Sequence, residues 1–334
     1  MKKLPILTIW LLAVVVLGAW HRAQAWPQNA DATDTPAETS AVAAEPPAAP
    51  ESAEQATEIL RQVRETLFGH ESIKAQLTQT VSLGDYRFRS NGEFVSASGF
   101  RFKLEYQLEL AHLRGTFLEV CDGQMLHTQR TLQELPAEPG GRPGEPETEV
   151  SRRDVQRILK ETRQHLDQPV ALQAAELGLG GLPAVVASLE RCMIFDTVRE
   201  EQLGGQPVLT LEGKWNPQRR SELLAGLGPM ANGIGGFMPD LVRLAIDGQT
   251  RFPLRIQYLK QIDPDKSSYQ PMLTLAFSNI RFDEPVGFET FTYLPPQGLE
   301  EQDETARFIQ MIQAAAAAPA GAGESTGGPV SPAN

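Results

Sequence analysis

The chain has 334 residues, and 30 Lys and Arg side chains against 42 Asp and Glu side chains give it a formal net charge of −12. This acidic balance argues against a nucleic-acid-binding protein, because neutralising phosphates requires clustered Lys and Arg. Hydrophobic residues make up 41% of the chain, as in globular proteins, and two cysteines are too few for a thiolate zinc site or a disulfide-dense scaffold.

The N-terminal residues 1–25 have the pattern of a secretory signal peptide. Lys2 and Lys3 supply the positive start, and a nearly unbroken apolar run follows over residues 4–20. Small residues at Ala23 and Ala25 suit cleavage by a signal peptidase. The alternative is an uncleaved membrane anchor, for which the apolar run is short. The pattern predicts an exported protein.

The two ends of the mature chain are predicted to be disordered. Residues 26–51 are rich in Ala, Pro, Glu and Thr and contain no Lys or Arg. A segment of this composition cannot bury enough apolar surface to offset the entropy of ordering. Residues 314–334 form a tail rich in Ala, Gly and Pro with the same expectation. The folded domain is therefore expected to span residues 52–313.

The folded part is expected to begin with a helix and to continue with strands. Apolar residues recur at helical spacing over residues 52–68, and Gly69 is suited to end the helix. Residues 73–81 then alternate with the period of two that is typical of a half-buried strand. Asp122 and Gly123 predict a turn between two further strands.

Two segments alternate most strictly between apolar and polar residues. They cover residues 100–110 and 252–258, and each predicts an antiparallel strand with one buried face. The second follows a strand predicted at 241–246, across a turn at Asp247 and Gly248. The apolar positions are Phe100, Phe102, Leu104, Tyr106, Leu108 and Leu110 in the first segment and Phe252, Leu254, Ile256 and Tyr258 in the second.

A loop and two helices interrupt the strand pattern in the middle of the chain. Residues 134–149 are rich in Pro and Gly and are expected to form an exposed loop. Helices are predicted over residues 151–166 and 182–190. Many consecutive strands with short turns and few helices predict a large antiparallel meander. Other strands are expected at 193–198, 208–211, 273–277 and 288–293.

No pattern in the chain indicates catalysis. The sequence contains no G-x-S-x-G motif, no P-loop and no G-x-G-x-x-G unit between a strand and a helix. The histidines are scattered and have no metal-binding spacing. We therefore expect a protein that is not an enzyme and that uses no metal and no cofactor.

Two questions stay open on the residues alone. Cys121 and Cys192 form one disulfide bond in an exported chain or remain two buried thiols. The few predicted helices either close the apolar face of the sheet completely or leave an apolar cavity, and such a cavity would bind lipid or another apolar ligand.

The order of several short motifs resembles that of the LolA superfamily of periplasmic lipoprotein carriers. The segment FTYLPPQGL at residues 291–299 is similar to the closing strand of the family. DGQML at 122–126 is similar to its D-G-x-x-L-W hairpin, with His127 in place of the Trp. IKAQLTQT at 73–80 resembles the first strand, and GLP at 181–183 resembles the start of a mid-chain helix.

The resemblance implies a mainly β, α+β fold: an open antiparallel β half-barrel with a few helices as a lid over its concave apolar face. In that family the cavity receives the acyl chains of lipoproteins in the periplasm. The family's K-R-P segment corresponds to residues 96–101, which contain no proline. Arg101 lies on the polar side of its strand, so the role of the family's arginine is not carried over to it.

The sequence therefore predicts a periplasmic, non-enzymatic carrier or binding protein for the acyl chains of a lipoprotein or lipid. The alternative is an envelope sensor or protein-interaction module on the same fold. Expected partners are an acylated lipoprotein or lipid and envelope membrane proteins. Residues 233–238 either help to gate the opening or form a simple surface loop. The residues expected to line the cavity are Phe100, Phe102, Leu104, Tyr106, Leu108, Phe252, Leu254, Ile256 and Tyr258.

Overall fold

The computed structural model describes the chain from Pro50 to Ala317 with short gaps. The predicted signal peptide, nearly all of the predicted linker and residues 233–237 lie outside the described residues. In the described part, no helix has the length and apolar character needed to cross a membrane. The described residues are 50–83, 86–110, 113–136, 142–165, 175, 178–227, 238–263 and 268–317.

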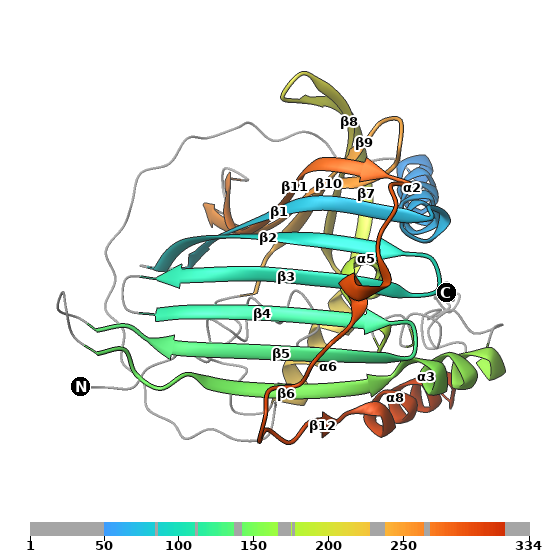
Figure 1. The fold of residues 1–334 in the computed structure, drawn as a ribbon. Helices are drawn as coiled ribbons and strands as arrows, with labels where there is room; N and C mark the ends of the chain where they lie inside the picture. The colour runs from blue at the N-terminus through green and yellow to red at the C-terminus, as the bar shows by residue number, and fades with distance from the viewer. Residues whose placement is uncertain are drawn as a thin grey trace, which may run out of the picture.

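Twelve strands form a single open sheet, in the order β12-β6-β5-β4-β3-β2-β1-β11-β10-β9-β8-β7 (Figure 1). All neighbouring strands are antiparallel except β6 and β12, which are parallel. The end strands β7 and β12 do not pair, so the sheet does not close into a barrel, and the predicted open antiparallel half-barrel is confirmed. The strands are β1 (Ser72–Leu83), β2 (Tyr86–Ala97), β3 (Arg101–Leu110), β4 (Leu113–Asp122), β5 (Met125–Glu134), β6 (Glu147–Asp154), β7 (Met193–Leu203), β8 (Gln206–Trp215), β9 (Leu241–Asp247), β10 (Pro253–Asp263), β11 (Ser268–Phe282) and β12 (Gln302–Asp303).

The helices lie mostly on one face and at the ends of the sheet. In Figure 1, α5 and α6 lie behind the sheet, while α3 and α8 lie side by side near the end of β6. We call the face covered by α5 the inner face, and the opposite one the outer face. The helices are α2 (Pro50–Gly69), α3 (Val155–Thr162), η1 (Arg163–His165), α5 (Gly181–Cys192), α6 (Pro217–Leu227), η5 (Phe288–Phe291) and α8 (Thr305–Ala317).

The inner face carries the main hydrophobic core. Strands supply every second side chain to it, as in Ile73, Ala75 and Leu77 of β1. The helices add apolar residues from the other side, among them Val63 of α2 and Val186 of α5, both fully buried. Because strand side chains alternate between the two faces, the residues between these core positions lie on the outer face.

A segment after β11 crosses the outer face and forms a second, smaller apolar contact. We call residues 283–304 the strap; in Figure 1 it runs in front of the sheet, through η5 to β12. Phe291 of the strap is buried, as are Val95 and Val120 of the sheet, and these three residues are not part of the main core. Arg101 lies over the Phe291 ring, 5.5 Å from its centroid.

The structure corrects three of the predicted elements. The predicted strand at 288–293 is wrong, because Phe288–Phe291 forms the 3-10 helix η5 in a segment rich in Pro and Gly. The predicted helix at 151–166 begins only at Val155, where the side chain of Asp154 caps it, and the residues before it belong to β6. The helix α8 was not predicted, and it continues to Ala317, past the predicted end of the domain.

Glycines allow close approach of neighbouring atoms at two positions in the sheet. A Cβ atom on Gly92 of β2 would overlap the carbonyl oxygen of Glu105 and the Cβ atom of Tyr106 on β3. On Gly213 of β8, a Cβ atom would lie 2.6 Å from the Phe195 ring. Glycine inside a strand is typical of a bend or of a close contact, and both roles apply to a strongly curved sheet.

We expect Gly92→Ala to destabilise the domain by about 3 kcal/mol, because the new methyl group overlaps backbone atoms that cannot move freely. Urea unfolding followed by circular dichroism measures this loss. The control is Gly69→Ala, since no atom lies within 4 Å of the position of its Cβ. Equal stability of the two variants would contradict the proposed close contact between β2 and β3.

Candidate functional site

The predicted lining residues lie on the inner face, with one exception. On β3, Phe102, Leu104, Tyr106 and Leu108 are buried and share the core side of the strand. The second predicted group is also buried and belongs to the same core; it consists of Phe252, just before β10, and of Leu254, Ile256 and Tyr258 on β10. The two groups are not adjacent, because β2, β1 and β11 lie between them.

Phe100 does not belong to this face. It precedes β3 in the turn after Gly99, where both residues have positive φ angles of 61° and 78°. Its side chain is 37% exposed and contacts the ring of Phe68 edge-on at 5.8 Å. The strand therefore begins one residue later than predicted, because the left-handed backbone of the turn points the Phe100 side chain away from the strand face.

The inner face is continuous across the middle of the sheet. Strand register aligns one row of side chains across nine neighbouring strands, a path of about 38 Å at roughly 4.8 Å per strand. Most of this row is aliphatic, and Gln79 and Ser90 interrupt it near the centre. From β8 to β5 the row contains Leu211, Leu244, Ile256, Leu275, Gln79, Ser90, Leu108, Gly115 and Leu132.

The helix α5 covers this face from its N-terminal end. Gly180 and Gly181 precede and begin the helix with φ angles of 73° and 69°, which favour glycine. A Cβ atom on Gly180 would lie 2.6 Å from Leu126, and one on Gly181 would lie 3.1 Å from the ring of Phe102. The two glycines therefore let the start of α5 lie directly against the inner face of β3 and β5.

A buried ion pair joins the sheet to this helical cover. Arg153 of β6 and Glu119 of β4 have side chains only 6% and 4% exposed, with Nη2 and Oε1 3.5 Å apart. The backbone N–H of Gly181 donates to Glu119 Oε2 at 3.3 Å, so this carboxylate also lies at the positive end of α5. Arg153 further donates to the carbonyl oxygen of Gly178 and lies over the ring of Phe308 from α8.

Among the described residues of the inner face, Nε of Arg153 lies 3.7 Å from Glu304, and three other buried donor atoms have no hydrogen-bond acceptor. They are the hydroxyl of Tyr106, Nε2 of Gln79 and Nε of Arg130. Tyr106 is 2% and Gln79 is 1% exposed. Burial raises the pKa of the Tyr106 hydroxyl well above its usual value, so the group is a neutral donor at physiological pH.

Sequence reasoning missed these inward polar residues. Glu119, Thr128, Arg130 and Arg153 lie on strands where charged or hydroxyl residues occupy core positions. The strand predictions relied on apolar residues at every second position. A polar residue at an inward position therefore interrupted the predicted alternation and was not recognised as part of a site. The one available signal was Glu119, a charge placed between Phe117 and Cys121 at the spacing of a buried face.

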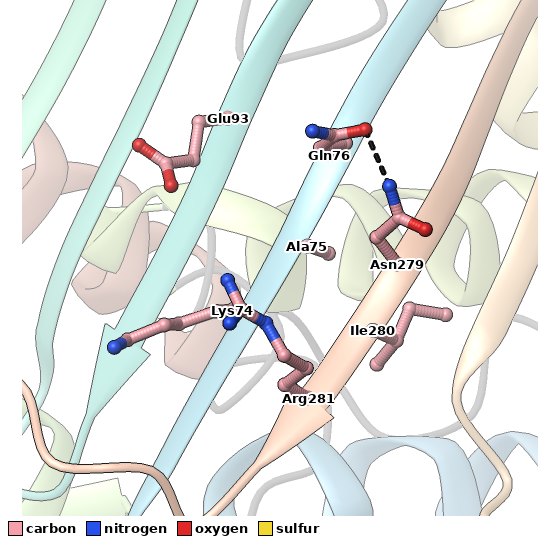
Figure 2. Close-up of a pocket in the computed structure, with 7 residues that line it drawn as sticks. All are labelled: Lys74, Ala75, Gln76, Glu93, Asn279, Ile280 and Arg281. Atoms are coloured by element: carbon pink, nitrogen blue, oxygen red, sulfur yellow. Dashed lines mark hydrogen bonds between the residues drawn. The ribbon is translucent and has the colours of Figure 1, made fainter.

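The outer face holds a depression of a different character (Figure 2). It measures about 430 Å³ and lies where the register of β1 against β11 shifts after Lys74. Gln76 accepts a hydrogen bond from Asn279 at 2.7 Å across it. The two cations at its rim, Lys74 and Arg281, already pair with Glu284 of the strap. This charged surface is unsuited to a hydrocarbon chain.

The described part of the chain contains no group of His, Cys, Asp or Glu side chains that could hold a metal ion. His127, which replaces the tryptophan of the family hairpin, lies on the outer face instead. Its ring stacks on Tyr293 of the strap at 4.5 Å, and its Nδ1 lies 2.8 Å from Glu301. This histidine therefore helps to fasten the strap to the sheet.

The disulfide alternative for Cys121 and Cys192 is wrong, because both side chains are thiols. Cys121 lies on β4, whereas Cys192 ends α5 near Tyr258 of β10. The 12 residues of α5 span about 18 Å and carry the chain from the β4 side of the sheet toward β10. A disulfide needs Cα atoms within about 7 Å. Burial raises the pKa of the Cys121 thiol to about 12.

No protein-family model and no curated protein matches the amino-acid sequence. The structure is similar to that of MucB over 72% of this chain and 63% of MucB, with 12% identity and a TM-score of 0.37. For MucB in complex with MucA the match spans 59% of the MucB chain, so this chain covers less than two thirds of both.

A LolA superfamily protein from Nitrosomonas europaea matches over 71% of this chain and 97% of its own, with 12% identity and a TM-score of 0.25. A DUF1329 family protein from Desulfovibrio piger matches over 72% and 98%, with 10% identity and a TM-score of 0.26. The open antiparallel sheet itself agrees with the half-barrel that the sequence motifs predicted.

We expect Arg153→Met to destabilise the domain by about 3 kcal/mol, because it removes the buried cation that lies beside the Glu119 carboxylate. Adding Glu119→Gln should recover part of this loss, which urea unfolding of the single and double variants measures. Arg61→Ala removes a solvent-exposed ion pair on α2 and should leave the unfolding midpoint unchanged. If Arg153→Met behaves like Arg61→Ala, the buried pair does not hold the cover.

Titration of the denatured, unreduced protein with Ellman's reagent should find two thiols per chain, and one in the Cys121→Ala variant. In the native protein Cys121 should react slowly, because it is buried and its thiolate is disfavoured. Finding no thiol in the denatured protein would show that the cysteines are bonded and that the position of α5 is incorrect.

Proposed function

We propose that the protein is a carrier or binding protein for acyl chains, which lie between the inner face of the sheet and the helical cover. The observation that carries the proposal is the long aliphatic row on the inner face of an unclosed sheet. Burial of hydrocarbon is favourable by roughly 0.8 kcal/mol per CH₂ group, so an apolar surface of this kind binds acyl chains without specific chemistry.

The distribution of the helices supports this proposal. The most extensive helix–strand contacts in the described part of the chain involve β3, β5, β6 and β7. The strands between these regions, including β1 and β10, form the middle of the inner face. Their inward side chains, such as Leu77 and Ile256, are buried, so a ligand must separate the cover from the sheet before it binds.

The start of α5 is the place where the cover is best able to move. Gly180 and Gly181 have positive φ angles, and glycine tolerates the backbone changes of a hinge. The hydrogen bond from Gly181 to Glu119 and the bond from Arg153 to Gly178 fasten this hinge to the sheet. We infer that ligand entry breaks these contacts and that their re-formation closes the site.

Export to the periplasm is part of the proposal. The N-terminal residues 1–25 have the sequence pattern of a cleaved signal peptide, and the acidic residues 26–51 suit a tether that leaves the domain free to move. A periplasmic carrier shields acyl chains from water between membranes. An acylated lipoprotein and a lipid are both cargoes of this chemistry.

Filling the inner face should block acyl binding. We expect Ile256→Trp and Leu108→Trp to weaken the affinity for palmitate about tenfold or more, because the indole occupies the ligand's space. Displacement of the fluorescent probe N-phenyl-1-naphthylamine by palmitate measures this affinity. Two substitutions on separate strands guard against the misfolding of one. The matched control is Gln257→Trp, which adds the same ring on the opposite face of β10.

Binding that is lost in both inner variants and retained in Gln257→Trp supports the proposal. Thermal melting of all three variants shows whether each is folded before its affinity is compared. A folded wild-type protein that takes up neither the probe nor palmitate would contradict it.

A second candidate function, an interaction module for a protein partner, has one observation in its favour. The strap exposes large apolar side chains, with Phe288 63% and Leu294 83% exposed. A partner that docks on these residues leaves the inner face untouched. In that case Leu294→Asp abolishes partner binding while Ile256→Trp does not affect it.

A further inference from the structure

The inner face contains hydrogen-bond donors that the protein itself does not satisfy. Tyr106, Gln79 and Arg130 each have one buried nitrogen or hydroxyl without an acceptor. Buried polar groups in proteins are nearly always paired, and each one left unpaired costs about 1–3 kcal/mol. Three of them on one face indicate that the face receives acceptor atoms from a ligand.

Two of the three residues contact the same aromatic ring. Tyr106 of β3 stacks on Phe117 of β4, with ring centroids 4.9 Å apart. The Arg130 guanidinium of β5 lies over the same Phe117 ring, 5.8 Å from its centroid. Gln79 of β1 lies in the neighbouring row, and its Oε1 is engaged by the hydroxyl of Ser90, which leaves its Nε2 as the open donor.

The two halves of the inner face differ in their content of polar side chains. On the side of β8 to β11, the aligned residues Leu211, Leu244, Ile256 and Leu275 are all aliphatic. On the side of β3 to β5 this row continues with Leu108, Gly115 and Leu132, but the neighbouring row there contains Tyr106, Phe117 and Arg130, with Glu149 of β6 opposite Arg130. An amphiphile matches this division if its hydrocarbon lies along β8 to β11 and its oxygen-bearing part lies at the donors.

We propose that Tyr106 and Arg130, which contact the same Phe117 ring, form a subsite for the acceptor oxygens of an acylated amphiphile, either an ester or amide carbonyl or a phosphate, and that Gln79 is a further donor two strands from Tyr106, on β1. The subsite rests on the proposed acyl-binding function and adds the ligand's polar chemistry to it. Tyr106 and Gln79 donate to a neutral carbonyl oxygen as readily as to an anion. Arg130 favours a phosphate, although Glu149 in register opposite it offsets part of that charge.

The test compares three ligands that share a C16 chain. Palmitoyl lysophosphatidylglycerol has an ester and a phosphate, monopalmitoylglycerol has only the ester, and a pyrene-labelled alkane has neither. We expect Tyr106→Phe to weaken binding of the two esters about tenfold and to leave alkane binding unchanged, as loss of one hydrogen bond implies. Arg130→Met affects only the phospholipid if phosphate is the acceptor.

A stability measurement separates ligand recognition from a structural role. Tyr106→Phe removes an unpaired buried hydroxyl, so the unliganded variant should melt at the same temperature as wild type or higher. The matched control is Tyr293→Phe on the strap, which removes a hydroxyl bonded to Gln129. The control should melt no higher than wild type and bind all three ligands normally.

The outcomes distinguish the subsite from the proposed function. If Tyr106→Phe binds every ligand as wild type does, or loses the alkane together with the esters, the subsite is overturned while acyl binding stands. If the unliganded Tyr106→Phe variant melts at a clearly lower temperature, the hydroxyl has a structural role and the subsite is also overturned. If wild type binds none of the three ligands, both proposals fail.

Discussion

Burial of the inner face of an unclosed, strongly curved sheet is the constraint on which the rest of the structure depends. Twelve strands satisfy their backbone hydrogen bonds with one another, but an open sheet leaves one apolar face that no other strand covers. Helices must therefore supply the cover, and they do so from the two ends and through α5. A helix that packs on a sheet through side chains can move away without breaking any hydrogen bond between strands. A reversible binding site requires such a movement.

A few polar contacts connect the helical cover to the sheet at defined points, whereas most of the surface between the cover and the sheet is apolar. Glu119 and Arg153 connect β4 and β6 with the start of α5 and with α8 through directional contacts at a few points. A buried ion pair adds little net stability but strongly penalises wrong geometry, so it suits a hinge that must return to one position. The strap packs on the opposite, outer face. There, Tyr293 and Glu301 of the strap contact His127 and hold the strap against β5.

The alternation of β3 and β10 was sufficient to predict an antiparallel sheet and to place eight of the nine predicted lining residues on one face, whereas the resemblance of the short motifs supplied the expectation that the sheet is open. The prediction was wrong at Phe100, where two left-handed residues precede β3, and at the last predicted strand, where η5 and the strap follow the outer face instead. The polar residues of the inner face could not be predicted, because Glu119 and Arg153 are 34 positions apart and only the register of three strands brings them together. The disulfide alternative failed for a related reason, since the direction of α5 across the sheet is a tertiary property.

Native mass spectrometry of the exported chain, purified without detergent, tests most directly whether the inner face accepts hydrocarbon. The account predicts a complex with one acylated molecule, taken up in the cell or from added phospholipid, that dissociates when the protein is unfolded. A spectrum that shows only the mass of the folded polypeptide, before and after exposure to phospholipid and to an acylated peptide, would contradict it.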